Sequence, residues 1–341
     1  MLRIPALDGL RALAVGAVML FHLQVPGFAL GWAGVPLFFV LSGYLITGNL
    51  IAARGPAPDP ALGPYLFTFY WRRTVRIFPL YYFYLLVNGL LCLGFGVSLA
   101  GYGWFAAFLG NQFIGAHAPD VTGGYVGHLW SLAVEEQFYL AWPFLVFALA
   151  PARLRWLAVV MIVAAPLVRQ LLVTTGNPYL AIVTLPSCMD MLAAGALVAL
   201  TGDRRLGLAM AVAGTAITAW CLTTTPYAAY WLTPEWVPQG HILFTGLALV
   251  FAPLLRLAPA IPGLAARPLV YAGTISYGLY IWHPLVFAAV HKAHLPPVAD
   301  AVLGLALAFG VASASWHLFE NVILKLKDRY PVRAGTVIKV R

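Results

Sequence analysis

Residues 7–23, LDGLRALAVGAVMLFHL, decide the fold of this chain. The segment is apolar enough to enter a membrane, yet it carries Asp8, Arg11 and His22. On an α-helix, Arg11 and His22 lie within roughly 20° of one another around the axis and roughly 16 Å apart along it. Asp8 precedes Arg11 by three residues, which makes their side chains neighbours on the helix surface. One face of one membrane helix therefore carries an ion pair and an imidazole at two depths.

Ionisable side chains cost free energy inside a membrane, so they normally face a protein interior or a polar cavity. A single such residue is more often structural than functional. Three on one face favour a functional site. The alternative is a buried ion pair with a histidine that helps helices pack.

The composition of the chain is that of a membrane protein. Of its 341 residues, 62% are hydrophobic and only 9% are charged, and the mean hydropathy is +0.86. Soluble domains usually contain about 25% charged residues. The net charge of +9 is read as a topology signal rather than as nucleic-acid binding, because the basic residues are distributed between apolar segments. Cys92, Cys188 and Cys221 lie in apolar segments and predict neither a disulfide framework nor a zinc site.

The hydropathy pattern predicts an all-α polytopic membrane protein with about ten transmembrane helices. Residues 102–115 are apolar but too short to cross a bilayer, so we predict a re-entrant or interfacial segment there. The predicted spans are residues 7–25, 31–51, 77–97, 129–149, 156–173, 180–200, 207–224, 239–255, 268–290 and 300–322.

The distribution of positive charge predicts the orientation in the membrane. With ten spans and the N-terminus inside, seventeen Lys and Arg residues fall in inner loops and the C-terminal tail, and only Lys292 falls outside. Such an excess is typical of cytoplasmic loops. We therefore predict two cytoplasmic termini, a transmembrane domain over residues 1–324 and a basic cytoplasmic tail over residues 325–341.

Three arginines, Arg72, Arg73 and Arg76, end the predicted inner loop 52–76. Arg73 and Arg76 lie one helical turn apart and can bind one anion together, because each planar guanidinium donates two parallel hydrogen bonds to a phosphate. Anchoring to lipid headgroups is the alternative. The spacing alone favours neither.

The segment HLWSLAVEEQFYLAWP, residues 128–143, carries a second polar face. His128, Ser131, Glu135 and Tyr139 follow helical spacing and share that face. Two adjacent glutamates near the middle of a membrane are costly unless they are used or paired. Glu135 is therefore a candidate site residue.

Two further spans contain polar residues. Ser276, Tyr280 and His283 share a face of the ninth predicted span, where a structural histidine is the more common case. Asp190 in the sixth span and Glu320 near the inner end of the last are read as structural. We expect Glu320 to pair with an inner arginine.

Together these features fit a thioester donor carried by coenzyme A. Its phosphates need cationic partners at the inner surface, and its long arm can reach a base within the membrane. A histidine near a carboxylate can act as general base on a hydroxyl. A proton-coupled transporter or exporter of saccharides fits nearly as well, because buried His, Glu and Asp residues also form proton relays.

The ordered motifs resemble those of the acyltransferase-3 family of integral membrane O-acyltransferases, over most of the chain. R-x10-H alone is a weak pattern, but the ordered set is specific. The matching pieces are Arg11 and His22 in R-x10-H, GVPLFFVLSGYLIT at 34–47, Arg73 and Arg76 in R-x-x-R-I-x-P, WSLAVEEQFY at 130–139 and ISYGLYIWHPL at 275–285.

The resemblance implies an enzyme of the bacterial inner membrane with about ten helices. It moves an acyl group, usually acetyl, from cytoplasmic acyl-CoA to a hydroxyl of a saccharide or glycoconjugate, often at the outer face. No metal is implied. The implied catalytic residues are His22 and Glu135, and the implied donor-binding residues are Arg11, Arg73, Arg76 and Arg72. The supporting residues are Asp8, Ser131, His128, Tyr139, Ser276, Tyr280 and His283.

The segment PSCMDMLAAG around Asp190 departs from the family pattern. Many relatives carry an arginine just before this aspartate, where this chain has Cys188 and Met189, so a donor or acceptor contact from this helix has no support here. Some relatives also carry a fused extracytoplasmic hydrolase-like domain, which we do not expect in this sequence. The sequence leaves open the acceptor, the length of the acyl chain, a covalent intermediate and the oligomeric state.

Overall fold

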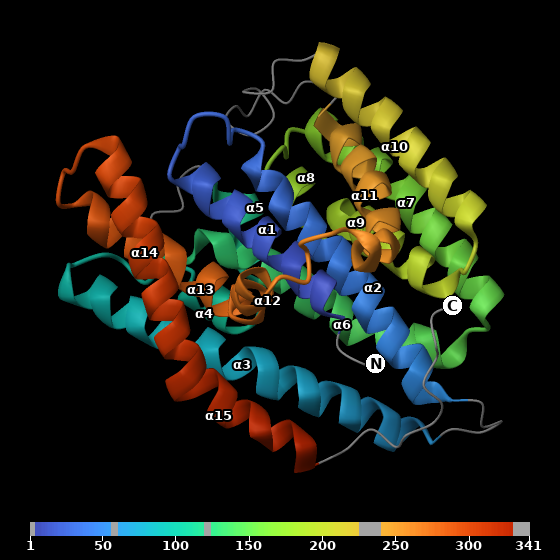
Figure 1. The fold of residues 1–341 in the computed structure, drawn as a ribbon, viewed down its shortest axis with the longest axis horizontal. Coiled ribbons are helices and arrows are strands. Elements are labelled where there is room, and N and C mark those ends of the chain that lie inside the picture. The colour runs from blue at the N-terminus through green and yellow to red at the C-terminus, as the bar shows by residue number, and fades with distance from the viewer. Residues whose placement is uncertain (1–3, 56–60, 119–123, 225–239, 330–341) are drawn as a thin grey trace.

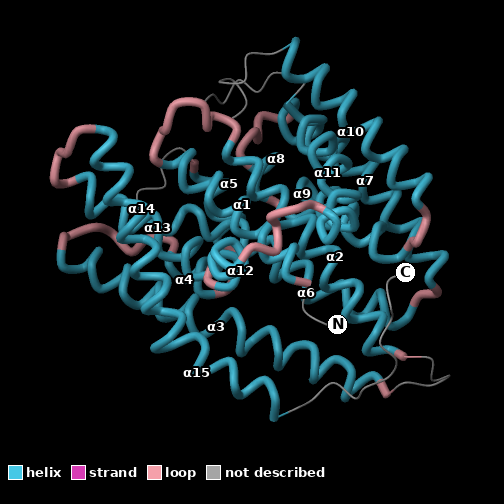
Figure 2. Tube along the Cα trace, viewed as in Figure 1, coloured by secondary structure: helices cyan, strands magenta, loops and turns pink. Residues whose placement is uncertain are grey.

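The computed structural model describes residues 4–55, 61–118, 124–224 and 240–329. These residues form helices and loops, and no strand occurs among them (Figure 2). The α-helices are α1 Pro5–His22, α2 Gly34–Arg54, α3 Leu62–Gly94, α4 Tyr102–Ala106, α5 Gly110–His117, α6 Trp130–Ala148, α7 Pro151–Thr174, α8 Leu180–Val183, α9 Leu185–Leu200, α10 Arg204–Thr224, α11 Gly240–Leu257, α12 Arg267–Thr274, α13 Ser276–His291, α14 Pro297–Ser315 and α15 Asn321–Leu324. Short 3-10 or π turns are η1 Gly31–Ala33, η2 Gly124–Leu129, η4 Ala258–Ala260, η5 Trp316–Glu320 and η6 Lys325–Arg329.

Three helices, α1, α2 and α9, lie at the centre of the bundle (Figure 1). The backbones of α2 and α9 approach closely, since a Cβ built on Gly43 would lie 1.9 Å from the Leu192 carbonyl oxygen. The converse also holds, since a Cβ on Gly195 would lie 2.0 Å from the Val40 carbonyl oxygen. Small residues let membrane helices approach in this way, where hydrophobic exclusion from water does not drive association. This close pair forms the rigid centre on which the other helices pack.

Eight helical segments are long and apolar enough to cross a membrane, counted over the described residues. The remaining two predicted spans correspond to α6 and α13. The first turns of α6 carry Glu135, Glu136 and Gln137, and α13 has only 16 residues. The all-helical polytopic fold is therefore confirmed. The two helices that fall outside this criterion carry some of the polar residues of the candidate site, namely Glu135 on α6 and Tyr280 and His283 on α13.

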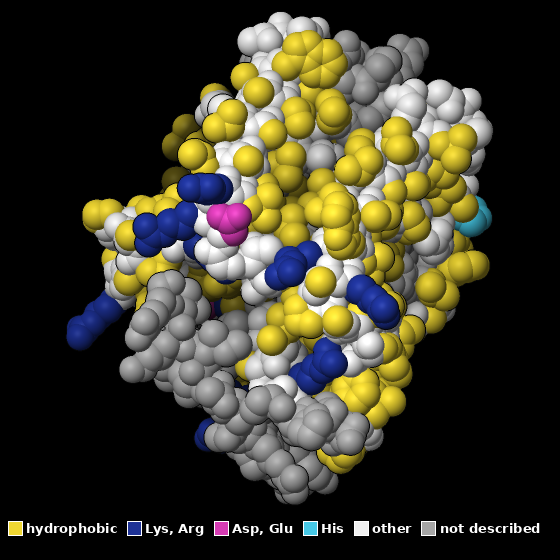
Figure 3. Space-filling model, turned by 90° about the vertical axis from the view of Figure 1, so that its right-hand side faces the viewer, with side chains coloured by type: hydrophobic (Ala, Val, Ile, Leu, Met, Phe, Trp, Pro, Cys, Tyr) yellow, Lys and Arg dark blue, Asp and Glu magenta, His cyan; other side chains and the backbone are white. Residues whose placement is uncertain are grey.

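The outer helices present apolar side chains to the surroundings. Trp156 on α7, Leu208 on α10 and Val298 on α14 are among the exposed ones. Large exposed apolar surface is unusual in a soluble protein and is expected where lipid covers the helices. Figure 3 shows Lys and Arg side chains on one face of the molecule, set among apolar side chains.

The third helix differs from the prediction. Residues 52–76 are not a loop up to Arg76, because α3 begins at Leu62 and continues for 33 residues. Its first half is held by neighbouring segments: the Tyr70 hydroxyl donates to the Leu140 carbonyl and the Trp71 indole to the Leu326 carbonyl. The three arginines therefore lie within a long helix rather than at its start.

The ninth predicted span, 268–290, is broken at Ile275 into α12 and α13. The break follows Gly273, whose missing side chain lets the backbone of α12 meet the Asp8 carbonyl of α1. The Ser276 hydroxyl donates to the Gly273 carbonyl at 2.9 Å and stabilises the turn. The short helices α4 and α5 replace a full span at 102–115, as predicted. Of the predicted tail, η6 is described and residues 330–341 lie outside the described chain.

Candidate functional site

Two groups of polar side chains gather around α1. We call the first the histidine cluster and the second the arginine cluster. The histidine cluster comprises His22, His128, Tyr280 and His283. The arginine cluster comprises Arg11, Arg73, Arg76, Glu135 and Glu320.

A hydrogen bond between two imidazoles forms the centre of the histidine cluster. Nδ1 of His22 lies 2.8 Å from Nε2 of His283, and the rings stack with an interplanar angle of 16°. His22 is the last residue of α1 and is exposed, whereas His283 on α13 is completely buried. The buried ring therefore fixes the orientation of the exposed one.

Tyr280 links this pair to the start of α6. Its hydroxyl lies 2.6 Å from the Ser131 hydroxyl and donates to the His128 carbonyl at 2.9 Å. The His128 ring meets the His283 ring nearly edge-on at a centroid distance of 5.6 Å. Neither buried nitrogen of His128 has a well-aligned hydrogen-bond partner in the described part of the chain. His128 precedes α6 on η2, yet the face predicted from helical spacing does bring it next to Ser131.

The arginine cluster lies near the other half of α1. Arg11 forms a 2.7 Å ion pair with Asp8, as predicted, and one third of its side chain stays exposed. Arg73 stacks over the Tyr139 ring at 5.0 Å, and Arg76 over the Trp316 and Tyr277 rings at 5.5 and 5.8 Å. Stacking holds a guanidinium while its N–H donors remain available.

Neither Arg73 nor Arg76 has an ion pair within 4.0 Å among the described residues. Both side chains are only half-buried. Arginines placed inside a membrane bundle usually pair with a carboxylate or a carbonyl. These two are instead fixed by aromatic rings with their donors unused, which is the arrangement that an incoming anion needs.

Glu135 lies beside Ser42 and Tyr139 and close enough to Arg73 and Arg11 to interact electrostatically with both. The Ser42 and Tyr139 hydroxyls are themselves hydrogen-bonded. Glu135 therefore belongs to the arginine cluster. The resemblance implied Glu135 as a catalytic residue together with His22, but the hydrogen-bond partner of the His22 side chain among the described residues is His283.

Glu320 was expected to pair with an inner arginine, but it has no ion pair within 4.0 Å among the described residues. It is buried on the π turn η5 and accepts a hydrogen bond from Ser315 at 3.1 Å. The other carboxylate oxygen of Glu320 has no hydrogen-bond partner within the segments that the structure describes. It does lie within electrostatic range of Arg76 and packs against Gly278. π turns are frequent at functional sites. Glu320 is therefore a candidate site residue, whereas the sequence alone had suggested a purely structural role.

Asp190 has a strong partner that its local sequence does not reveal. Arg169 of α7 forms a two-pronged ion pair with it, at 3.1 and 2.7 Å, in a fully buried position. The Thr245 hydroxyl of α11 joins both groups at 2.7 and 2.6 Å. No arginine directly precedes Asp190 in the sequence, but Arg169 on another helix pairs with it.

Two predicted residues do not join either cluster. Arg72 points about 100° away from Arg73 around α3. Within the described chain it makes no ion pair and no cation–π contact, and its buried Nε has no hydrogen-bond partner. Ser276 bonds the preceding turn. Ser42, Tyr84 and Tyr277 line the two clusters and were missed, although Ser42 lies in the quoted segment 34–47.

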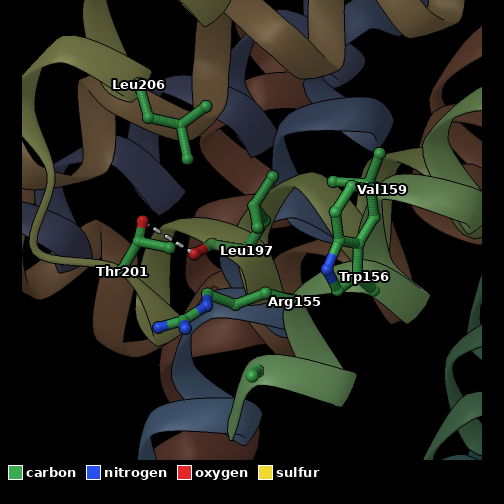
Figure 4. Close-up of a pocket in the computed structure, with 7 residues that line it drawn as sticks. Arg155, Trp156, Val159, Leu197, Thr201 and Leu206 are labelled. Atoms are coloured by element: carbon green, nitrogen blue, oxygen red, sulfur yellow. Dashed lines mark hydrogen bonds between the residues drawn. The ribbon is translucent and has the colours of Figure 1, made fainter.

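A separate pocket of about 290 Å³ lies between α7, α9 and α10 (Figure 4). Arg155, Trp156, Leu197 and Leu206 are among its lining residues. Thr201 there bonds its own helix at the Leu197 carbonyl. The lining is mostly apolar and contains neither histidine nor carboxylate, so the two clusters, and not this pocket, are the candidate site.

Comparison with known proteins agrees with the geometry. Residues 4–317 match the acyltransferase-3 family, described as an acyltransferase domain. The chain belongs to this family. The match covers every residue of both clusters except Glu320.

Two relatives show what the chain is similar to. It is 28% identical to the peptidoglycan O-acetyltransferase OatA of Listeria monocytogenes, over 94% of this chain and 56% of that protein. It is 27% identical to the O-acetyltransferase OatA of Staphylococcus aureus, over 94% of this chain and 57% of that protein. The chain therefore spans a little over half the length of these relatives. No solved structure matches it.

Proposed function

We propose that this protein transfers an acetyl group from acetyl-CoA, or a related acyl-CoA, to a hydroxyl of a cell-surface saccharide. The main observation is that Arg73 and Arg76 stack on aromatic rings and form no ion pair within 4.0 Å among the described residues, on the same bundle as the exposed His22. The two R-x10-H residues lie about 16 Å apart along α1. A donor with anionic phosphates at one end and a thioester on a long arm matches this separation.

The donor would enter from the cytoplasm. The positive-inside pattern predicts that the half of α1 bearing Arg11 faces the cytoplasm, in a bacterial inner membrane with both termini inside. Arg73 and Arg76 would then bind the phosphates with paired, charge-assisted hydrogen bonds. Glu135, beside Arg73 and Arg11, would keep the cluster from carrying an excess of uncompensated positive charge.

The reaction itself would take place at His22. Nε2 of His22 takes the proton of the acceptor hydroxyl while the hydroxyl oxygen attacks the thioester carbon. The new C–O bond forms, the C–S bond breaks, and the proton passes from His22 to the leaving thiolate. The products are an O-acyl saccharide and free coenzyme A. Because the Listeria relative is a peptidoglycan O-acetyltransferase by name, a peptidoglycan hydroxyl is the proposed acceptor.

The test uses the purified full chain in lipid nanodiscs with acetyl-CoA and peptidoglycan fragments. We expect free thiol release together with an acetylated fragment in the mass spectrum. His22→Ala should lower turnover by roughly 10²–10⁴-fold, the usual contribution of a general base. The matched control is His291→Ala, a second histidine at a helix end, whose side chain is 84% exposed and belongs to neither cluster.

Two outcomes would count against the proposal. Full turnover by His22→Ala would show that His22 is not the base. Movement of a saccharide across proteoliposomes without any thiol release would favour the proton-coupled transporter instead. Labelling of single-cysteine variants from either side of the membrane tests the orientation separately.

A further inference from the structure

The hydrogen bonds of His283 determine where its proton lies. Its Nδ1 is 2.9 Å from the Tyr280 carbonyl oxygen and 3.1 Å from the Leu279 carbonyl oxygen. A carbonyl oxygen can only accept, so Nδ1 must carry the hydrogen. In a neutral imidazole the other nitrogen, Nε2, then has a lone pair and can only accept.

The next residue explains why a carbonyl is available. In an α-helix the Tyr280 carbonyl would accept from the amide of residue 284. Residue 284 is Pro284, which lies inside α13 and has no amide hydrogen. The Tyr280 carbonyl therefore lacks its helical donor, and Nδ1 of His283 takes that place. The dipeptide His283-Pro284 thus encodes both the acceptor and its donor.

The consequence passes to His22. Nε2 of His283 accepts, and the atom 2.8 Å from it is Nδ1 of His22. That nitrogen must donate, so Nδ1 of His22 carries the hydrogen and Nε2 carries the lone pair. Nε2 has no hydrogen bond within the described chain, and His22 is exposed. The nitrogen that is left free is therefore the one able to take a proton.

We propose that His283 is a positioning residue that holds His22 in the Nδ1–H tautomer, and that Pro284 in turn fixes His283. The consequence for turnover rests on the proposed function. During transfer, His22 would become protonated at Nε2, and its Nδ1–H bond to His283 would strengthen as charge develops. The complete burial of His283 keeps water from competing for Nε2.

The first test reads the tautomer directly. The full chain, labelled with ¹⁵N-histidine and placed in nanodiscs, is compared with His22→Gln to assign the His22 signals. We expect Nδ1 of His22 to be protonated and Nε2 to be unprotonated near neutral pH. His283→Phe removes the acceptor and should allow both tautomers, whereas the side-chain carbonyl of His283→Gln accepts again and should restore the Nδ1–H form.

The second test measures turnover with acetyl-CoA and peptidoglycan fragments. His283→Phe should lower kcat by about 100-fold, since loss of the correct tautomer is known to cost a base up to about 10⁴-fold. The KM for acetyl-CoA should change by less than about threefold, because the arginine cluster is untouched. His283→Gln should recover at least about tenfold of the lost kcat, and Pro284→Ala should lower kcat less than His283→Phe does.

The two proposals can fail separately. A wild-type His22 protonated at Nε2 but not Nδ1, or an unchanged tautomer in His283→Phe, would overturn the role of His283 whatever the activity. A wild-type protein that shows the expected tautomer but transfers no acyl group would overturn the proposed function alone. If His283→Phe is not monodisperse, the tautomer of His22 is measured in Pro284→Ala instead. There the Tyr280 carbonyl regains an amide donor, so we expect both tautomers of His22. An unchanged Nδ1–H form would contradict the role of Pro284.

Discussion

Arg169 and Arg76 both lie inside the helical bundle, but the structure gives only one of them a complete set of partners. Arg169 donates to both oxygens of Asp190, to the Thr245 hydroxyl and to the Ser187 carbonyl. It is 1% exposed. Arg76 is half-buried, stacks on two aromatic rings and has no ion pair within 4.0 Å among the described residues.

This difference separates a structural arginine from one that is available to a ligand. A buried ion pair is stable only when good geometry and further hydrogen bonds compensate for the lost hydration of both charges. The Arg169 site meets that requirement by itself. The arginine cluster meets it only in part, and a bound phosphate would complete it. The comparison therefore predicts that substitutions at Arg169 change stability, whereas those at Arg76 change binding.

Arg169→Ala should have the largest effect. Removing one partner leaves the Asp190 carboxylate buried without its counter-ion, and such losses cost about 3–5 kcal/mol. The free energy of unfolding can be measured in mixed micelles by titration with SDS. Arg76→Ala is the control and should lie within about 1 kcal/mol of the wild type, because Arg76 forms no ion pair within 4.0 Å among the described residues. Equal losses in the two variants would remove the distinction on which this comparison depends.

The second prediction replaces the whole buried group. The triple variant combines Arg169→Met, Asp190→Leu and Thr245→Val. Its three new side chains are apolar, so none of them leaves an unpaired charge or hydroxyl. Apolar replacements of buried ion pairs are often neutral or stabilising, so we expect most of the loss in Arg169→Ala to be recovered, by about 2–3 kcal/mol. The same SDS titration measures it. Activity should persist in the triple variant, and its absence would mean that the Arg169 group serves catalysis as well as folding.

The sequence predicts one helix face far better than it predicts contacts between helices. Helical spacing correctly paired Asp8 with Arg11 and brought His128 next to Ser131. Hydropathy predicted eight of the ten spans as single helices long enough to cross a membrane, and the short segment at 102–115. These features depend on residues a few positions apart, where the geometry of a single helix decides the outcome.

Contacts between distant residues were not predictable in this way. Spacing offers no link between Arg169 and Asp190, which lie on different helices, or between His22 and His283, which are 261 residues apart in sequence. Glu320 looked structural because the π turn that exposes it to the arginine cluster has no simple sequence signal. The start of α3 was placed too late, because its arginines resemble an inner loop until the aromatic rings that hold them are seen.

The third prediction tests the planar geometry of the guanidinium. Arg76→Lys keeps the charge but loses the two-pronged hydrogen bond to a phosphate and the stacking on Trp316. We expect the KM for acetyl-CoA to rise about tenfold, which corresponds to about 1.4 kcal/mol, with kcat within about threefold. Arg72→Lys on the same helix is the matched control and should leave KM unchanged. If Arg76→Lys and Arg72→Lys have the same KM for acetyl-CoA, the donor does not contact Arg76.

The smallest effect is expected at Ser276, a residue of the same family motif as His283 but with a local role. Its hydroxyl donates to the Gly273 carbonyl where α12 ends, and Ser276→Ala should lower the free energy of unfolding by about 0.5–1 kcal/mol. Turnover and the KM for acetyl-CoA should stay at wild-type values. Ser131→Ala is the matched comparison, since its hydroxyl bonds Tyr280 in the histidine cluster, and it should reduce kcat. A drop in kcat for Ser276→Ala that equals the drop for Ser131→Ala would show that the whole motif, and not only its His283 end, acts in the reaction.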